Sequence, residues 1–214
     1  MCGIAGLSVL SDQAPADLVP IAARMGAAIA HRGPDAAGTW QHPALGVALA
    51  HQRLAILDLS PAGHQPMASA SGRYVIAFNG EIYNHQQLRR ELDAAGLAPP
   101  WRGHADTETL LAAIEAWGLE SALQRCAGMW ALALVDQHQR VLHLARDRFG
   151  EKPLYWGLSG SGTGQALLFG SELAALRAYP GFNNTIDRAA LAQLLRFGQV
   201  PAPLSIYAGI AKLP

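Results

Sequence analysis

A cysteine directly follows the initiator methionine and opens the run Met1-Cys2-Gly3-Ile4-Ala5-Gly6-Leu7. Removal of Met1, which the small Cys2 side chain permits, would leave one residue carrying both a thiol and a free α-amine. A thiol with a pKa of about 8.5 is mostly protonated at neutral pH, yet it is intrinsically very nucleophilic. An α-amine titrates near ~7.7–8.0, so it could accept the thiol proton directly or through a water. The pattern indicates a nucleophile and its base on one residue, the alternative being that a cysteine follows the start codon by chance.

Four further segments concentrate polar groups at predicted turns and strand ends, where sites are usually built. They are His31-Arg32-Gly33-Pro34-Asp35, Gln52-Arg53-Leu54, Asn79-Gly80-Glu81-Ile82-Tyr83-Asn84 and Gly103-His104-Ala105-Asp106-Thr107-Glu108. Taken alone, each has an ordinary structural explanation. Asn79-Gly80 is typical of a type I′ hairpin turn, Asp106 of a helix N-cap, and Arg53 of an exposed strand residue.

The histidines and cysteines do not predict a metal site. None of the eight histidines falls at an i, i+4 spacing in a helical motif. Cys2 and Cys126 are the only cysteines, so neither a paired-cysteine zinc motif nor a disulfide framework is expected. Cys126 is interpreted as a small core residue, whereas an exposed reactive thiol at Cys2 fits a reducing, cytoplasmic location.

The composition argues against nucleic acid and membrane partners. Lys and Arg number 16 and Asp and Glu number 16, so the net charge is zero and attracts neither nucleic acid nor an acidic bilayer. The N-terminus does not have the pattern of a signal peptide, and no segment approaches the ~18 apolar residues of a membrane span. Charged residues make up only 15% of the chain, which indicates either an alanine-rich composition or a surface covered by a partner.

Hydrophobic periodicity and turn residues predict alternating groups of strands and helices that must position these side chains. Helices are expected at 15–30, 84–95, 106–117, 171–179 and 187–197. Residues 157–164 are expected to form a flexible hairpin connection and residues 198–214 a linker. Strands are expected at 3–9, 45–52, 54–58, 73–78, 129–136, 140–145, 154–158 and 166–169, with a turn at Asn79-Gly80.

This order of elements favours antiparallel sheets with helices on their outer faces. We therefore expect an α+β fold of two stacked sheets between helical layers. A chain of 214 residues can bury roughly 70% of its unfolded surface, so its core needs no disulfide or metal.

In the order of its motifs the chain resembles the N-terminal glutaminase domain of asparagine synthetases, which are class II glutamine amidotransferases with an N-terminal nucleophile. The likeness also covers residues 146–155 (RDRFGEKPLY) and 169–173 (FGSEL). It implies a four-layer αββα sandwich of the Ntn-hydrolase type. It further implies a glutaminase domain at residues 1–197 and, at residues 198–214, the start of a linker to a synthetase domain.

The resemblance implies that the chain hydrolyses L-glutamine to glutamate and ammonia. Cys2 would attack the side-chain amide carbon, release ammonia and leave a glutamyl thioester that water cleaves. The Asn79 side-chain amide and the Gly80 backbone N–H would stabilise the oxyanion, with a tight turn holding both groups and glycine letting the backbone approach closely.

Free glutamine is a zwitterion, so its pocket needs one cation and one anion. By resemblance, Arg53 binds the α-carboxylate and Asp106 the α-ammonium, with Glu81 beside it. Backbone groups of the strand that follows Arg53 would line the pocket, namely Leu54, Ala55, Ile56 and Leu57. A supporting loop near the nucleophile would comprise His31, Arg32, Gly33 and Asp35.

In the family, an ATP-dependent synthetase domain follows, adenylates aspartate and receives the ammonia through a tunnel. This sequence has neither its glycine-serine-aspartate loop nor a P-loop pattern, so no cofactor is expected in these residues. ATP and magnesium would bind the synthetase domain. We expect a fragment, an isolated domain or a truncated gene product. Open alternatives are a non-catalytic glutamine-binding or docking module for a separate synthetase and an amidotransferase with a different acceptor, and a homodimer also stays open.

Overall fold

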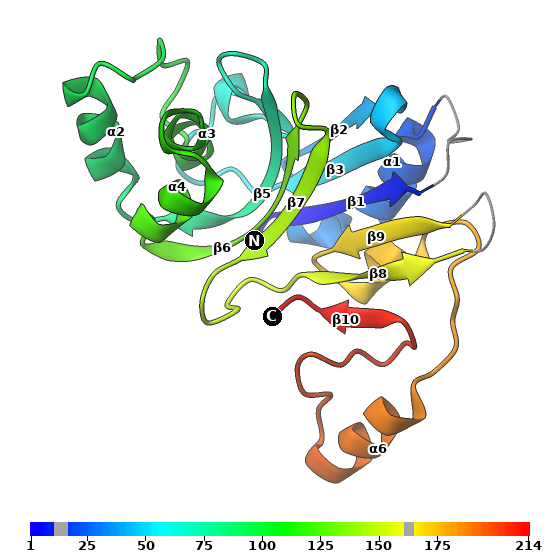
Figure 1. Cartoon of the computed structure of the whole chain (residues 1–214). Coiled ribbons are helices and arrows are strands. Elements are labelled where there is room, and N and C mark those ends of the chain that lie inside the picture. Colours follow the sequence, from blue (N-terminus) through cyan, green and yellow to red (C-terminus); the bar gives the residue numbers. More distant parts are fainter. Residues whose placement is uncertain (11–16, 161–164) are drawn as a thin grey trace.

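Two antiparallel sheets stack on each other with helices on both outer sides (Figure 1). The structure, a computed structural model, describes residues 1–10, 17–160 and 165–214. The larger sheet has the strand order β10-β8-β9-β1-β3-β2 and the smaller sheet β4-β5-β6-β7. The strands are β1 (Gly3–Val9), β2 (Ala36–His42), β3 (Val47–Arg53), β4 (Met67–Ala68), β5 (Tyr74–Ile82), β6 (Gly128–Asp136), β7 (Val141–Arg146), β8 (Tyr155–Ser159), β9 (Ala166–Gly170) and β10 (Ile210–Lys212).

Three hydrophobic layers hold these sheets and helices together. One layer fills the space between the sheets and contains Ile4, Val75 and Phe169. A second lies between the larger sheet and helices α1 and α5, and a third between the smaller sheet and helices α2, α3 and α4. The helices are α1 (Val19–Ala27), α2 (His85–Ala94), α3 (Asp106–Trp117), α4 (Leu119–Arg125), α5 (Leu173–Arg177) and α6 (Arg188–Phe197). This arrangement confirms the predicted four-layer αββα sandwich.

Strand β5 shows how one strand serves two layers. Its side chains alternate, so Ile76 and Phe78 pack against the helices while Val75 and Ala77 face the other sheet. Asn79, the next residue in this second series, therefore also faces the other sheet. Strand β1 lies in the middle of that sheet, between β3 and β9, and begins one residue after Cys2.

Two of the predicted local structures are wrong. Residues Leu54–Asp58 form no strand but a loop that leaves the end of β3. Asn79-Gly80 forms no turn, because β5 continues through it and pairs with β6 in the register Asn79↔Ala131 and Gly80↔Trp130. The cross-strand pairing overrides the local turn preference of these two residues.

The helices are mostly shorter than the periodicity suggests. Helix α1 covers Val19–Ala27, and the first two residues predicted for it lie outside the described residues. Residues 161–164 of the predicted hairpin connection also lie outside them. Asn84 occupies the N-cap position of α2 but does not cap it, since its side chain bonds the backbone of Arg125 and Ala127 instead. Asp187 does cap α6, accepting hydrogen bonds from two backbone N–H groups of the first turn.

The stretch from residue 198 onward is more ordered than a linker. Its residues Ile210–Lys212 form β10, which pairs with β8 at the edge of the larger sheet. Leu213 N then donates to Leu154 O at 2.8 Å. The domain boundary near residue 197 stays a prediction. Among residues 1–10, 17–160 and 165–214, no helix combines the length and hydropathy that crossing a bilayer would require.

Candidate active site

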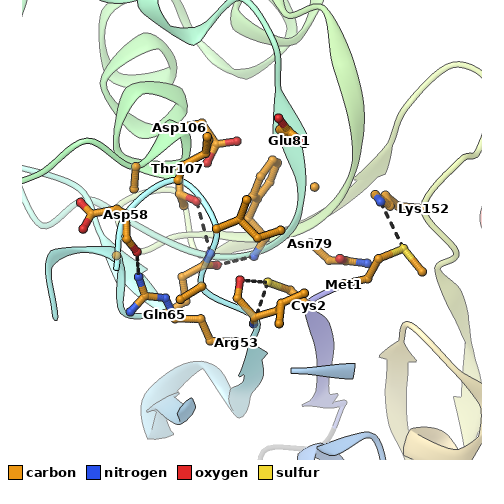
Figure 2. Close-up of a pocket in the computed structure, with 18 of the residues that line it drawn as sticks. Met1, Cys2, Arg53, Asp58, Gln65, Asn79, Glu81, Asp106, Thr107 and Lys152 are labelled. Atoms are coloured by element: carbon orange, nitrogen blue, oxygen red, sulfur yellow. Dashed lines mark hydrogen bonds between the residues drawn. The ribbon is translucent and has the colours of Figure 1, made fainter. Parts of the chain in front are cut away.

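A cavity of about 310 Å³ opens where the start of β1 meets β5 and the first turn of α3 (Figure 2). The structure brings to it every residue predicted to catalyse or to bind substrate. These are Cys2, Arg53, Leu54, Ala55, Ile56, Leu57, Asn79, Gly80, Glu81 and Asp106. The four residues of the predicted supporting loop do not line the cavity.

The thiol of Cys2 contacts the loop that follows β3. Leu54 N donates to Cys2 Sγ at 3.4 Å, and Sγ lies 3.5 Å from Leu54 O. Burial raises the pKa of the Cys2 thiol, and the hydrogen bond from Leu54 and the nearby N-terminal charge offset only part of that effect. The group is therefore a thiol at neutral pH, and a base must remove its proton before it can attack.

Met1 occupies the cavity wall next to the nucleophile. Its side chain is 56% exposed, and its Sδ accepts a hydrogen bond from Lys152 Nζ at 3.2 Å. While Met1 is attached, the nitrogen of Cys2 is part of a peptide bond and cannot act as a base. Removal of Met1 would free this nitrogen as a primary amine and enlarge the cavity.

The loop at residues 31–35 lies behind the nucleophile. Arg32 Nε donates to Cys2 O at 3.0 Å, and Arg32 Nη1 donates to Glu172 Oε1 at 2.8 Å. His31 Nε2 lies 3.1 Å from the same carboxylate oxygen. Although burial opposes it, hydrogen bonding from Arg32 and His31 lowers the pKa of Glu172. The backbone of the nucleophile is thus attached to the start of α5.

Two more residues of this loop support the cavity wall. Asp35 Oδ2 accepts a hydrogen bond from Ala55 N at 2.8 Å. This bond attaches the loop at residues 54–58 to the loop at residues 31–35. Gly33 passes so close to the backbone of Gln52 and Arg53 that a Cβ would overlap with them. A larger residue at 33 would push the two segments apart.

Asn79 presents an unpaired amide on the inner face of β5. The residue is 1% exposed, and within the described part of the chain its Nδ2 has no hydrogen-bond partner. An unsatisfied buried N–H typically costs about 1–3 kcal/mol, so such a group calls for an explanation. A ligand oxygen in the adjoining cavity would supply the missing acceptor.

The N–H of Gly80 points to the edge of β5 that faces away from β6. The backbone N and O of the opposite residue, Trp130, bond to Asp147 instead, so Gly80 and Trp130 form a pair without hydrogen bonds. On the same edge of β5, Phe78 N donates to Gln65 Oε1 at 2.7 Å. Ile82 N donates to Asp106 Oδ2 at 2.8 Å. The Gly80 N–H lies on this edge between those of Phe78 and Ile82, and Gly80 lines the cavity.

Glycine at position 80 serves a close backbone approach, as predicted, but not at a turn. Gly80 is not among the residues with positive φ, as a type I′ turn would require. A Cβ at this position would instead lie 2.5 Å from Met129 O and from Trp130 Cβ. Glycine therefore permits the close approach of β6, not a turn.

The acidic end of the cavity comprises Asp106 and Glu81. Asp106 is the first residue of α3, but its carboxylate does not cap the helix, since Oδ2 accepts from Ile82 N at 2.8 Å. Burial raises the pKa of Asp106, and the hydrogen bond from Ile82 opposes that shift. In Figure 2 Asp106 and Glu81 lie above the cavity, away from Arg53.

Arg53 supplies the positive charge, but its guanidinium also holds the adjoining loop. Nη1 donates to Ser60 O at 3.1 Å and Nη2 to Asp58 O. The Asp58 carboxylate in turn accepts from Ser60 N and from His104 N, both at 2.8 Å. Hydrogen bonds from Ser60 and His104 lower the pKa of Asp58 to about 2, so this residue stays charged and joins two walls of the cavity.

Several lining residues were missed in the sequence. The spacing of Asp58 and Ser60, typical of a side chain that bonds the backbone two residues on, could have indicated the first. Gln65 and Lys152 offer no local signal, because the atoms they contact belong to distant segments. The further lining residues are Met1, Asp58, Gly63, Gln65, Phe78, Ala105, Thr107, Met129 and Lys152.

Together these groups suit acyl transfer from a small zwitterionic amide. A thiol shares the cavity with Gly80 and with the Asn79 amide, whose Nδ2 is unpaired within the described ranges, and a cation and two carboxylates lie at the far walls. Across the described ranges, no group of three or more His, Cys, Asp or Glu side chains is arranged to hold a metal ion.

Comparison with known proteins identifies the family of this chain. A family model described as a glutamine amidotransferase domain matches residues 1–214. Asparagine synthetase (glutamine-hydrolyzing) 3 of Bacillus subtilis is 35% identical over 217 residues, covering 100% of this chain and 33% of its own. Asparagine synthetase (glutamine-hydrolyzing) 1 of the same organism is 35% identical over 214 residues, covering 100% of this chain and 32% of its own. The asparagine synthetase (glutamine-hydrolyzing) of Asparagus officinalis is 37% identical over 163 residues, covering 75% and 26%.

The chain thus spans about a third or less of the length of these relatives. Among solved structures, the glutamine phosphoribosylpyrophosphate amidotransferase of B. subtilis has a TM-score of 0.64 at 20% identity, covering 85% of this chain and 44% of its own. At that identity the likeness shows the fold alone. The match of the family model over the whole sequence shows more, and the chain belongs to the glutamine amidotransferase domain family.

Proposed function

We propose that this chain hydrolyses L-glutamine to glutamate and ammonia through a thioester on Cys2. One observation carries the proposal: the cavity beside the Cys2 thiol contains the unpaired Asn79 amide and the Gly80 N–H. A nucleophile next to two fixed N–H donors is the arrangement that acyl transfer requires.

The first half of the reaction forms the thioester. Once Met1 is removed, the α-amine of Cys2 takes the thiol proton, and Sγ attacks the amide carbon of glutamine. Asn79 Nδ2 and Gly80 N donate to the resulting oxyanion. Its collapse breaks the carbon–nitrogen bond, and the α-ammonium returns the proton to the departing ammonia.

The second half hydrolyses the thioester. The α-amine now accepts a proton from a water molecule that attacks the thioester carbonyl, and the same two donors stabilise the second oxyanion. Collapse expels the thiolate, which takes the proton back from the α-ammonium, and glutamate leaves.

The charged ends of the cavity select glutamine. Arg53 binds the α-carboxylate through guanidinium N–H groups that the loop carbonyls leave free, because a guanidinium has five such donors. Asp106 and Glu81 receive the α-ammonium. Hydrogen bonds to charged groups are worth about 1.5–3 kcal/mol each, so a ligand lacking either charge should bind weakly.

We further propose that the ammonia serves a synthetase portion like that of the relatives named asparagine synthetase, which are about three times longer. In that portion ATP and magnesium would activate aspartate for amidation. The low charge content of the chain supports a surface covered by such a neighbour. Release of glutamate and free ammonia is what the present residues would catalyse by themselves.

The proposal is tested on the purified chain. Intact mass should show that Met1 is absent, and incubation with L-glutamine should release glutamate and ammonia in equal amounts. A diazoketone analogue of glutamine should add to Cys2 and to no other residue, as read by peptide mass analysis. The Cys2→Ala variant is the matched control. Retained Met1 in active material, or equal activity of Cys2→Ala, would exclude the mechanism, and glutamine binding without ammonia release would favour a docking module.

A further inference from the structure

We infer that His51 and Gln65 are positioning residues that hold the oxyanion-binding segment of β5, so that Asn79 and Gly80 keep their place beside Cys2. The inference rests on the proposed function, since it matters only if Asn79 and Gly80 stabilise an oxyanion. Neither residue touches the reacting atoms in this scheme. Both act through Phe78, the residue that precedes Asn79.

His51 reaches across from the larger sheet to the smaller one. It lies on β3 in the same alternating series as Val47 and Leu49, which face the space between the sheets. Its Nε2 is 3.0 Å from Phe78 O, and this carbonyl belongs to the peptide bond that joins Phe78 to Asn79. The side chain is 1% exposed, so the bond is shielded from water.

The protonation of His51 fits the role of a fixed donor. Because Phe78 O can only accept, Nε2 must carry the hydrogen, and Nδ1 has no partner in the ranges that the structure describes. Burial lowers the pKa of His51 to about 4. The ring is therefore neutral at physiological pH, in one tautomer that the Phe78 carbonyl selects.

Gln65 holds the other backbone group of Phe78. Its Oε1 accepts from Phe78 N at 2.7 Å, and its Nε2 donates to Thr107 Oγ1 at 3.2 Å, as Figure 2 shows. Thr107 follows Asp106 in the first turn of α3. Gln65 thus connects the edge of β5 to the helix that carries the proposed ammonium-binding carboxylate.

These two side chains take the place of a neighbouring strand where, among the described residues, no strand pairs with this edge of β5. Strand β4 pairs with β5 only at Val75 and Ile76. Beyond that, the same edge of β5 carries the N–H and C=O of Phe78 and then the N–H of Gly80. Rotation of the peptide groups there would move both oxyanion donors, and a misplacement of about 1 Å can cost roughly 100-fold in rate.

The test is a double-mutant cycle on glutaminase kinetics. His51→Phe removes the donor, Gln65→Met removes the acceptor, and Asn79→Ala removes the group to be positioned. We expect His51→Phe and Gln65→Met each to lower kcat by about 10- to 100-fold with KM within about 2-fold of wild type. Combined with Asn79→Ala, each should cost less than it does alone, because one of the two donors it positions is already absent.

Rescue and a matched control separate positioning from general destabilisation. His51→Gln places an amide N–H near the lost Nε2–H and should recover most of kcat. Ser159→Ala removes a partly buried hydrogen bond made by a buried residue of β8, outside the cavity, where Ser159 Oγ accepts from Asn183 N at 3.1 Å. This control should lower the urea midpoint of unfolding and leave kcat unchanged.

The outcomes distinguish the inference from the function on which it rests. Normal kcat in His51→Phe and in Gln65→Met, with Asn79→Ala impaired, overturns the inference alone. A double variant whose loss of kcat equals the product of the two single losses also overturns it. A wild-type chain that releases no ammonia overturns the proposed function, and the inference with it. If His51→Phe does not fold, Gln65→Met makes the same test on the N–H of the same peptide segment.

Discussion

The two halves of the cavity are built in opposite ways. The nucleophile half is the chain end, where a partly buried Cys2 is attached through its carbonyl to Arg32 and, through Arg32, to the partly exposed Glu172. The oxyanion half is the interior of β5, where Asn79 is nearly inaccessible and is bordered by hydrogen-bonded residues on both sides.

This difference follows from what each half must do. On the proposed mechanism, the nucleophile half must release Met1 and let its sulfur form and break a bond, so it lies at an accessible chain end. The oxyanion donors act only if they are already in place, since moving dipoles during the reaction would cost part of the barrier reduction. The core of a sheet supplies that rigidity. We therefore expect substitutions in the first half to affect chemistry alone, and those in the second that break a buried hydrogen bond, at His51 or Gln65, to affect chemistry and stability together.

The largest expected effect is that of Cys2→Ala. It should abolish glutamine hydrolysis, because no other group in the cavity can form the thioester. Urea unfolding should change by no more than about 1 kcal/mol, because the side chain is small and only partly buried. A substantial residual rate of ammonia release, measured with a coupled glutamate assay, would contradict the assignment of the nucleophile.

Asn79→Ala should lower kcat by about 10²–10³ while KM changes little, as expected for a donor that acts on the oxyanion. Its effect on stability should be unusually small for so buried a residue. The cavity that is left costs free energy, but the unsatisfied Nδ2 donor disappears at the same time, and we expect a net change within about 1 kcal/mol. Parallel kinetics and urea titration check both parts, and a rise in KM without a fall in kcat would count against the assignment.

The lowered pKa of His51 predicts a pH range in which the free energy of unfolding falls. Burial lowers the pKa of His51 from 6.5 in the unfolded chain to about 4 in the folded one, so the unfolded chain binds a proton that the folded one excludes. The contribution is complete above pH 6.5 and is lost progressively as the pH falls to about 4. From 2.3RT per unit it amounts to about 3 kcal/mol.

Free energies of unfolding at pH 7.5 and pH 4.5 measure this contribution of His51. His51→Gln removes the titrating ring, so its stability should fall less over this range than that of wild type. Other titrating groups contribute equally to both proteins and cancel in the comparison. Parallel pH profiles for the two proteins would show that His51 is not buried as a neutral ring.

The smallest expected effect is that of Glu172→Gln in the nucleophile half. It weakens the attachment of Arg32 and His31 while leaving the Arg32 bond to Cys2 O in place. A partly exposed ion pair is worth about 1 kcal/mol or less, so stability should change by no more than that. We expect a few-fold loss of kcat/KM, and a loss as large as that of Asn79→Ala would mean that the two halves are equally sensitive.

Much of the site could be predicted from the sequence: Cys2 from its place behind the initiator methionine, and Arg53, Asn79, Gly80 and Asp106 from the resemblance of their motifs to a known family. Cys2 behind the initiator methionine, the Arg53 cation and the Asp106 carboxylate each have a chemistry that is independent of the fold. Most strands and helices also followed from hydrophobic alternation, because a sheet face or a helix stripe must be buried wherever it occurs, but β2, β4, α4 and β10 lie in segments where none was predicted. These features depend on neighbours that are close in sequence.

The errors have one cause. Asn79-Gly80 has the local preference of a turn, but pairing with Ala131 and Trp130, 52 and 50 residues away in sequence, keeps it extended. Residues Leu54–Asp58 have the composition of a strand, but hydrogen bonds from His104 to Asp58 and from Ala55 to Asp35 hold them as a loop. Local propensity is weak compared with such long-range contacts.

The sequence by itself determined which chemistry is available: a nucleophile at the chain end, two donors in one dipeptide, and charges for both ends of a zwitterion. Only the tertiary structure decided how these groups are held. The partners of His51 and Gln65 lie 27 and 13 residues away in sequence, and that of Lys152 lies 151 residues away. A side chain carries its reactivity with it, whereas its position is set by whichever segments folding brings alongside it.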